Sequence, residues 1–264
     1  MRSQAIDLVR CSHPEPVVTV TAASGVLALA AGRGLGTVWV VFAVLAGQLF
    51  VGWSNDYVDR SRDRAAGRAD KPLAKDRLNP RVVLVAAVVA LVAAVPLSLA
   101  SGVAAAAVHF TGIASATAYN LGLKSTALSP LPYALSFGLL PAFITLGLVH
   151  SHWPPAWMTA AAALIGVGGH FAQARPDVER DRRLGLRGLP ERLGSRGSGI
   201  ASAAFLAVAA AVIAAGSASL LPLIAIAPAL VVAFSPPSAA YRLTLLTAAV
   251  TVVAFVANAS SLRA

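Results

Sequence analysis

The acidic residues of this chain are few, and nine of the eleven are gathered in two short segments. They are Asp56, Asp59, Asp63, Asp70 and Asp76 in the first segment and Asp177, Glu179, Asp181 and Glu191 in the second. On a helix, Asn55, Asp59 and Asp63 recur every four residues and share one face, as do Asp177 and Asp181. Oxygen ligands in this arrangement suit Mg²⁺, which proteins hold with a few carboxylates and with substrate phosphates. The predicted metal ligands are Asn55, Asp59, Asp63, Asp177 and Asp181, with Asp56 as a weaker addition.

Basic residues near these acids complete a second part of the pattern. Arg68 and Lys71 follow the first segment, and Lys124 lies after a later apolar stretch. If the two acidic segments face each other, a diphosphate fits between them. Positive side chains and metal ions would then stabilise the charge that develops on it as its bond to carbon breaks. The pattern therefore predicts that Arg68, Lys71 and Lys124 bind a diphosphate.

The composition indicates the class of protein that positions these acidic and basic residues. Of the 264 residues, 57% are hydrophobic and 12% are charged, with a formal net charge of +10. The charged fraction is about half of the roughly 25% that is usual in soluble domains. These values exclude a water-soluble globular enzyme. They also exclude a nucleic-acid-binding protein, because the basic residues stand in apolar surroundings and form no solvated basic face.

Apolar stretches long enough to cross a bilayer recur along the whole chain. We expect nine transmembrane helices in a single domain of residues 1–264. The predicted spans are 16–32, 36–55, 81–100, 102–122, 130–149, 155–175, 199–216, 219–235 and 239–258. The expected fold is thus an all-α polytopic membrane protein.

The basic residues also predict the orientation of these spans. Four spans separate the basic loop at 60–81 from the one at 175–196, so the two loops lie on the same side. Loops on the cytoplasmic side of a membrane are enriched in Lys and Arg. We therefore expect a multi-pass protein of the cell inner (plasma) membrane, with its N-terminus and both acidic segments in the cytoplasm.

The two motifs resemble those of the UbiA superfamily of intramembrane prenyltransferases. Asn-Asp-x-x-Asp-x-x-x-Asp at 55–63 and Asp-x-x-x-Asp at 177–181 carry the resemblance. Lys71-Pro-Leu, Tyr119 followed by Lys124, and the run 181–194 extend it. Lys71 stands where this family more often has Arg. This difference weakens the inference of any particular acceptor from the family.

The resemblance implies a UbiA-like bundle of nine helices with a Mg²⁺-dependent active site that opens to the cytoplasm. It implies transfer of a prenyl group from a prenyl diphosphate to an acceptor such as an aromatic compound, a quinone precursor or another lipid. The implied catalytic residues are Asp59, Asp63, Asp177 and Asp181, and Tyr119 is expected to orient the substrate.

Two alternatives remain at this stage. A terpene cyclase of the same family would use the same acids on a prenyl diphosphate without an external acceptor. A cation-coupled transporter is more distant, because transporters usually place ionisable groups at mid-membrane, whereas these acids gather at one end of the spans. The sequence predicts the lipid bilayer as a partner and no obligate protein partner.

Overall fold

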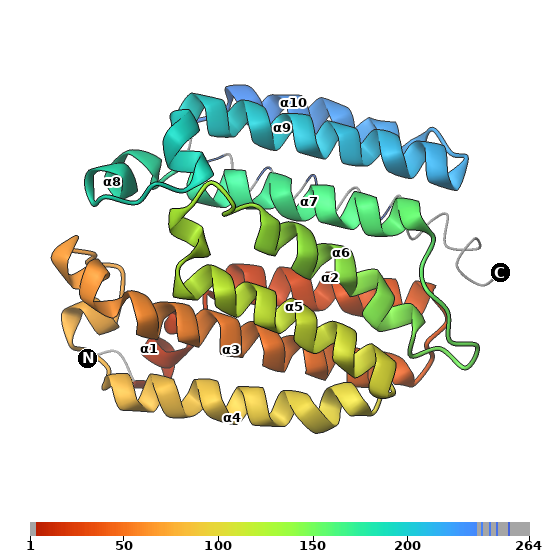
Figure 1. Ribbon diagram of the computed structural model, residues 1–264, viewed down its shortest axis with the longest axis horizontal. Coiled ribbons are helices and arrows are strands. Elements are labelled where there is room, and N and C mark those ends of the chain that lie inside the picture. The colour runs from red at the N-terminus through yellow and green to blue at the C-terminus, as the bar shows by residue number, and fades with distance from the viewer. Residues whose placement is uncertain (1–3, 237–238, 240–242, 244–246, 248–252, 254–264) are drawn as a thin grey trace.

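The computed structural model describes residues 4–236 together with residues 239, 243, 247 and 253. Within these residues the chain is helical and contains no strand, which confirms the predicted all-α class (Figure 1). In chain order the elements are α1 (Gln4–Cys11), α2 (Pro14–Ala30), α3 (Gly36–Ala65), η1 (Leu73–Lys75), α4 (Pro80–Leu99), α5 (Val103–Leu121), η2 (Leu123–Ser125), α6 (Leu131–Thr145), α7 (Ala156–Ala174), α8 (Val178–Arg183), α9 (Leu189–Ser217), η3 (Leu221–Ala225) and α10 (Ile226–Phe234).

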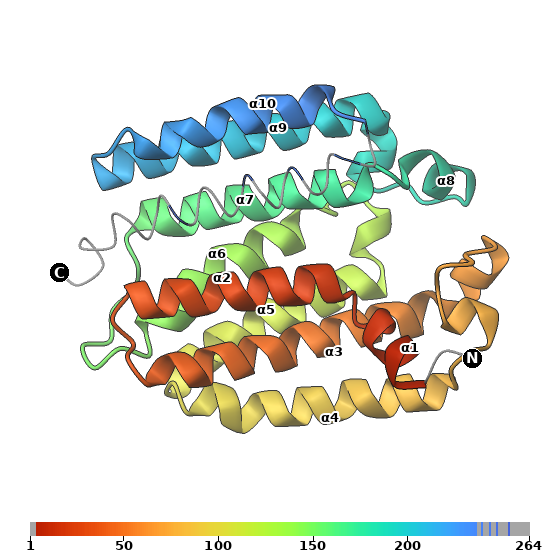
Figure 2. The same ribbon diagram turned by 180° about the vertical axis from the view of Figure 1, so that it is seen from behind.

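The long helices lie side by side in one bundle (Figures 1 and 2). α3 packs against α2, α4 and α5, while α7 packs between α6 and α9. The largest buried cluster joins these groups, with Val40 and Val44 from α3 against Phe143, Ile144 and Met158 from α6 and α7. Many other apolar side chains point outward, as expected for helices that face lipid.

Three described helices, α3, α4 and α9, are long and apolar enough to cross a membrane. The helix α2, the helix α6 and the segment 221–232 are shorter apolar stretches. Each of the first eight predicted spans coincides with a helix or with η3 and α10. Most of the ninth predicted span, 239–258, lies outside the described residues.

The helix α3 is longer than the span predicted for it. It contains 30 residues, which corresponds to about 45 Å at 1.5 Å per residue. A hydrocarbon core is about 30 Å thick, so α3 is longer than one span, and its charged residues all lie in its last turns. The predicted span ended at residue 55, whereas the helix continues through Asp63 and ends at Ala65.

The helix α9 also begins earlier than the span predicted at 199. Pro190 lies in its first turn, where backbone N–H groups have no acceptor within the helix, so the missing N–H of proline costs no hydrogen bond. Gly194 then interrupts the helix with φ 73° and ψ 174°. The polar turn before Gly194 is therefore a separate short helical piece that leads into the apolar span.

Candidate active site

The last turns of α3 carry Asp56, Asp59 and Asp63, and the short helix α8 carries Asp181, with Asp177 immediately before it. Both are at the same end of the bundle, on the left in Figure 1. Because α3 is continuous here, Asp59 and Asp63 lie one turn apart on one face. In the second motif the Asp181 amide donates a hydrogen bond to the Asp177 carbonyl at 2.8 Å. Each motif therefore presents two carboxylates separated by one helical turn.

Asp59 is buried and is paired with two basic groups. Lys124 donates to Oδ1, and Arg62 Nη2 lies 2.6 Å from Oδ2. Lys124 is itself 9% exposed and belongs to η2, so this contact ties α3 to the connection between α5 and α6. Burial lowers the pKa of Lys124, and the charge of Asp59 opposes this shift. A buried ammonium group thus lies next to the first acidic motif.

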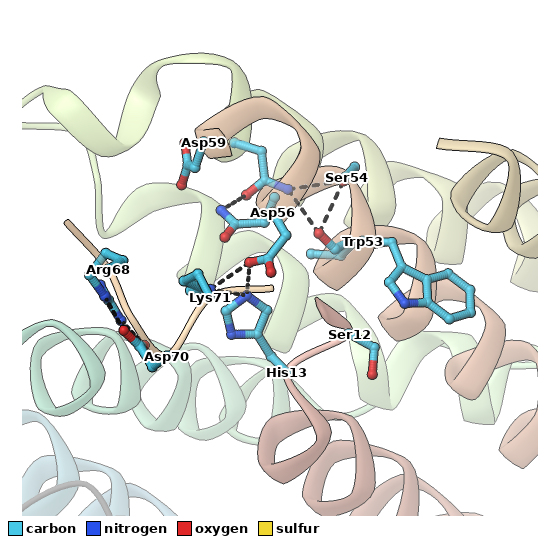
Figure 3. Close-up of polar contacts among 12 residues, drawn as sticks. Ser12, His13, Trp53, Ser54, Asp56, Asp59, Arg68, Asp70 and Lys71 are labelled. Carbon is cyan, nitrogen blue, oxygen red and sulfur yellow. Dashed lines mark hydrogen bonds and ion pairs between the residues drawn. The ribbon is translucent and has the colours of Figure 1, made fainter. Parts of the chain in front are cut away.

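Asp56 forms a second contact centre, shown in Figure 3. Its side chain is 1% exposed, and Lys71 Nζ lies 2.5 Å from Oδ1. His13 Nε2 lies 2.9 Å from the same oxygen. The other oxygen, Oδ2, is buried with no hydrogen-bond partner among the described residues. Asp56 is therefore held by the loop after α3 and by the segment that precedes α2.

Arg68, in the loop after the first motif, contacts the second motif across 109 residues of sequence. Its guanidinium makes a bidentate contact with Asp70, at 2.9 Å from Nε and 2.7 Å from Nη2. Its third nitrogen, Nη1, lies 3.4 Å from Asp177 Oδ2. The hydrogen bonds from Arg68 lower the pKa of Asp70 to about 2. The loop after α3 thus holds a fixed guanidinium beside the second motif.

Two of the predicted ligands have weaker pairing. Asp63 is 8% exposed and makes no side-chain hydrogen bond or ion pair with the described residues. Asp181 has a single ion pair there, with Arg180 Nε at 3.8 Å. Burial raises the pKa of Asp181, and the nearby charge of Asp177 raises it further. One incompletely neutralised carboxylate therefore comes from each motif.

These residues suit a hard cation in their chemistry. Their donors are carboxylate oxygens, and Asn55 adds an amide oxygen because its Nδ2 donates to Asn120 at 2.9 Å. In the described part of the chain, no three His, Cys, Asp or Glu side chains converge closely enough to enclose a metal ion. Instead, Asp56, Asp59 and Asp177 lie against basic side chains. Each carboxylate has about four acceptor positions, so these acids could bind a metal ion through the positions that the basic side chains leave open.

Tyr119 lies on α5 in an aromatic group near Lys124. Its ring meets Tyr133 and His170 edge-on, with centroid distances of 5.2 and 5.7 Å. His170 is 2% exposed, and its Nε2 lies 3.1 Å from Ser129 Oγ. The structure therefore places Tyr119 among ring faces from α6 and α7.

The connection between α8 and α9 lies close to η2. A Cβ at Gly188 would overlap the Lys124 carbonyl oxygen and the Glu191 carboxylate, so only glycine fits without a shift of backbone. Ser129 Oγ also accepts a hydrogen bond from the Leu189 amide at 3.1 Å. The chain after the second motif is thereby anchored beside Lys124.

Three residues at this end were not among the predicted site residues. They are His13, Arg62 and Asn120. Asn120 donates to the Val51 carbonyl at 3.0 Å and accepts from Asn55, and an amide inside an apolar span was an available signal. Arg62 stands among many loop arginines, and no spacing distinguishes His13. These contacts depend on how the chain folds back, which short motifs do not encode.

Known proteins match this chain over most of its length. The sequence matches the family model described as the UbiA prenyltransferase family over residues 17–262. The lycopene elongase/hydratase of Haloferax volcanii is 32% identical over 184 residues. This match covers 68% of the present chain and 60% of that protein, so it spans less than two thirds of the relative's length.

Solved structures share the fold. The apo structure of a UbiA homolog from Aeropyrum pernix K1 has a TM-score of 0.75 at 18% identity, covering 92% of this chain and 96% of that chain. The structure of a UbiA homolog from Archaeoglobus fulgidus bound to GPP and Mg²⁺ has a TM-score of 0.73 at 16% identity, covering 97% and 99%. At these identities the likeness establishes the arrangement of helices.

Proposed function

The chain belongs to the UbiA prenyltransferase family, as the resemblance of its two motifs predicts, and from this membership we propose that it transfers a prenyl group from a prenyl diphosphate to an acceptor in a Mg²⁺-dependent reaction. The observation that carries the proposal is the contact of Arg68 with Asp177, which brings the loop that follows the first acidic motif against the second motif at one end of the bundle. The A. fulgidus homolog of the same fold, bound to GPP and Mg²⁺, supports the choice of substrate and metal.

The proposed metal ligands keep the order of the sequence prediction. Asn55, Asp59, Asp63, Asp177 and Asp181 would hold Mg²⁺, and Asp56 is the weaker addition because it lies off the helical face that Asn55, Asp59 and Asp63 share and its side chain is only 1% exposed. When bound, Mg²⁺ supplies Lewis-acid stabilisation of the negative charge on the diphosphate.

The chain's own residues act on the diphosphate and on the cation that it leaves behind. Arg68, Lys71 and Lys124 bind the diphosphate oxygens and favour the state in which negative charge has developed on them. The C–O bond breaks, its electron pair leaves with the diphosphate, and an allylic cation remains. Tyr119, in its group of rings from α5, α6 and α7, offers aromatic surface to that cation.

The acceptor then forms a bond to the cationic carbon and loses a proton. We propose an acceptor that is soluble in the bilayer, because the helices around the site are apolar and present apolar side chains outward. The H. volcanii relative, named for lycopene, supports an acceptor of this kind. We further propose that residues 1–264 form one domain in the plasma membrane with the acidic end in the cytoplasm, because basic residues gather at that end.

The proposal is tested by incubating purified protein with GPP or DMAPP, MgCl2 and candidate lipid acceptors, followed by mass spectrometry of the products. Prenylated acceptor and released diphosphate are expected, and EDTA should abolish both. A cyclised product formed without acceptor would assign the chain to the cyclases instead.

Variants at the acids provide the decisive comparison. Asp59→Asn and Asp177→Asn should each lose at least about a hundredfold in rate, the scale for removal of one preorganised electrostatic group. Asp76→Asn is the matched control, because Asp76 is in the same basic loop with a side chain that is 76% exposed. If both site variants insert normally and keep full Mg²⁺-dependent consumption of GPP, the proposed site is wrong.

A further inference from the structure

The N-terminal arm, defined as residues 4–13, lies against the site end of α3 (Figure 2). Trp53 Nε1 donates a hydrogen bond to the Leu8 carbonyl at 2.9 Å. At Gly52 a Cβ would overlap the Ser12 carbonyl oxygen, so the absence of a side chain lets the two backbones touch. The arm is therefore seated on α3 immediately before the first acidic motif.

The same arm also holds the loop that carries Arg68 and Lys71. Cys11 is fully buried in a cluster with Leu73, Leu78 and Val83. Asp7 is 2% exposed and lies 3.8 Å from Arg77 Nε. The arm thus packs against α3 on one side and against the loop after α3 on the other.

His13 ends the arm at the point where these two partners meet. Its backbone is left-handed, with φ 59° and ψ 69°, a conformation that residues other than glycine seldom adopt. In this conformation Nε2 lies 2.9 Å from Asp56 Oδ1 and 3.1 Å from Lys71 Nζ (Figure 3). His13 from the arm and Lys71 from the loop after α3 therefore contact the same buried carboxylate oxygen.

This sharing bears on how Lys71 can serve a diphosphate. Lys71 has three donors, and one of them is directed to Asp56. Asp56 is almost completely buried, so it needs a hydrogen-bond partner at every stage. His13 can supply that partner at the same oxygen while Lys71 directs its charge toward substrate.

We propose that His13 is a positioning residue that holds Asp56 and thereby sets the place of the Lys71 ammonium group in the diphosphate site. The N-terminal arm is then part of the substrate-binding machinery, although it lies outside both acidic motifs. This inference rests on the proposed function, because it requires Lys71 to bind the diphosphate of a prenyl substrate.

The test compares His13→Leu with His13→Gln. Leu and Gln are both unbranched at Cβ, so they are similarly strained in the left-handed conformation of residue 13. Only Gln carries an N–H donor at about the same distance from the backbone as His Nε2. With GPP at saturating MgCl2, His13→Leu should raise KM about tenfold and leave kcat within about threefold, as expected for the loss of one hydrogen bond to a charged group. The Ki of inorganic pyrophosphate should rise in parallel, and His13→Gln should restore both constants. Glu15→Gln, an exposed position two residues away, is the control and should match the wild type.

A second measurement separates positioning from a role in folding alone. In a Lys71→Gln background, His13→Leu should change KM by less than about twofold, because residues that act through one contact are not additive. An unchanged KM in His13→Leu, or a tenfold effect that persists without Lys71, would overturn the inference. A fall in thermal stability and kcat with no rescue by Gln would also overturn it. Failure of the wild-type protein to consume any prenyl diphosphate would instead refute the proposed function.

Discussion

Replacement of Lys124 by Met should destabilise the protein as well as weaken substrate binding. Lys124 and Asp59 are 9% and 7% exposed, and they pair directly. Removal of one partner of a buried ion pair costs about 3–5 kcal/mol when the remaining charge has no other partner. Here Arg62 remains 2.6 Å from the second oxygen of Asp59. We therefore expect a smaller loss of about 2 kcal/mol in the free energy of unfolding.

The assay is thermal unfolding of the purified protein in detergent. For a chain of this size, about 2 kcal/mol corresponds to a fall in Tm of about 4–8 °C. Lys75→Met is the matched control, because Lys75 is an exposed lysine in η1, and its Tm should not change.

A double variant tests the reasoning itself. In Asp59→Asn with Lys124→Met, no buried carboxylate is left without its ammonium partner, so about 1 kcal/mol of the loss should be recovered. If the two substitutions are additive, or if Lys124→Met leaves Tm unchanged, the pair does not contribute as its geometry implies.

The other predictions concern the remaining contacts at this end of the bundle. Burial, with a further contribution from Asp56, raises the pKa of Cys11 to about 12, so this single cysteine should resist maleimide at pH 8.5 until denaturant is added. For the same reason Tm should fall as pH rises above 9, where the thiol ionises in the unfolded chain but not in the folded one. Cys11→Ala should remove that fall. If Cys11→Ala shows the same dependence of Tm on pH as the wild type, the raised pKa of Cys11 is contradicted. Gly188→Ala should lower the free energy of unfolding by about 1–3 kcal/mol through overlap with backbone, whereas Gly169→Ala, which has open space around it, should not. Arg68→Lys should raise the KM for GPP severalfold because lysine cannot contact Asp70 and the second motif together, and an unchanged KM would show that the bidentate geometry is not needed.

Helix boundaries were predictable where turn-forming residues coincide with the edge of the apolar stretch. The predicted spans 81–100 and 155–175 differ from α4 and α7 by one residue at each end. Pro80 starts α4 and Pro155 precedes α7, so the change in hydropathy and the change in backbone fall together. Hydropathy did not reveal the C-terminal end of α3 or the start of α9, because there each helix continues into polar sequence beyond its apolar part.

The end of the bundle that holds the site could be predicted from the positions of the charged residues. Which acid pairs with which base could not. Between residues 56 and 77 alone, acids and bases alternate so closely that many ion pairs have similar Coulomb energies. Long side chains allow most of them. The pairs that form are selected by packing, as when η2 brings Lys124 to Asp59.

The contact of His13 with Asp56 shows why such a residue escapes a motif. Its place depends on Gly52, which lets the backbone of the arm touch α3, and on a left-handed turn just before α2. Neither feature has a spacing relation to the acids, since 43 residues separate His13 from Asp56. The acidic motifs identify the groups that hold charge, whereas the positions of those groups depend on segments whose own sequences carry no chemical pattern. Substitutions limited to the two motifs would therefore leave the N-terminal arm untested, and the comparison of His13→Leu with His13→Gln is the experiment that reaches it.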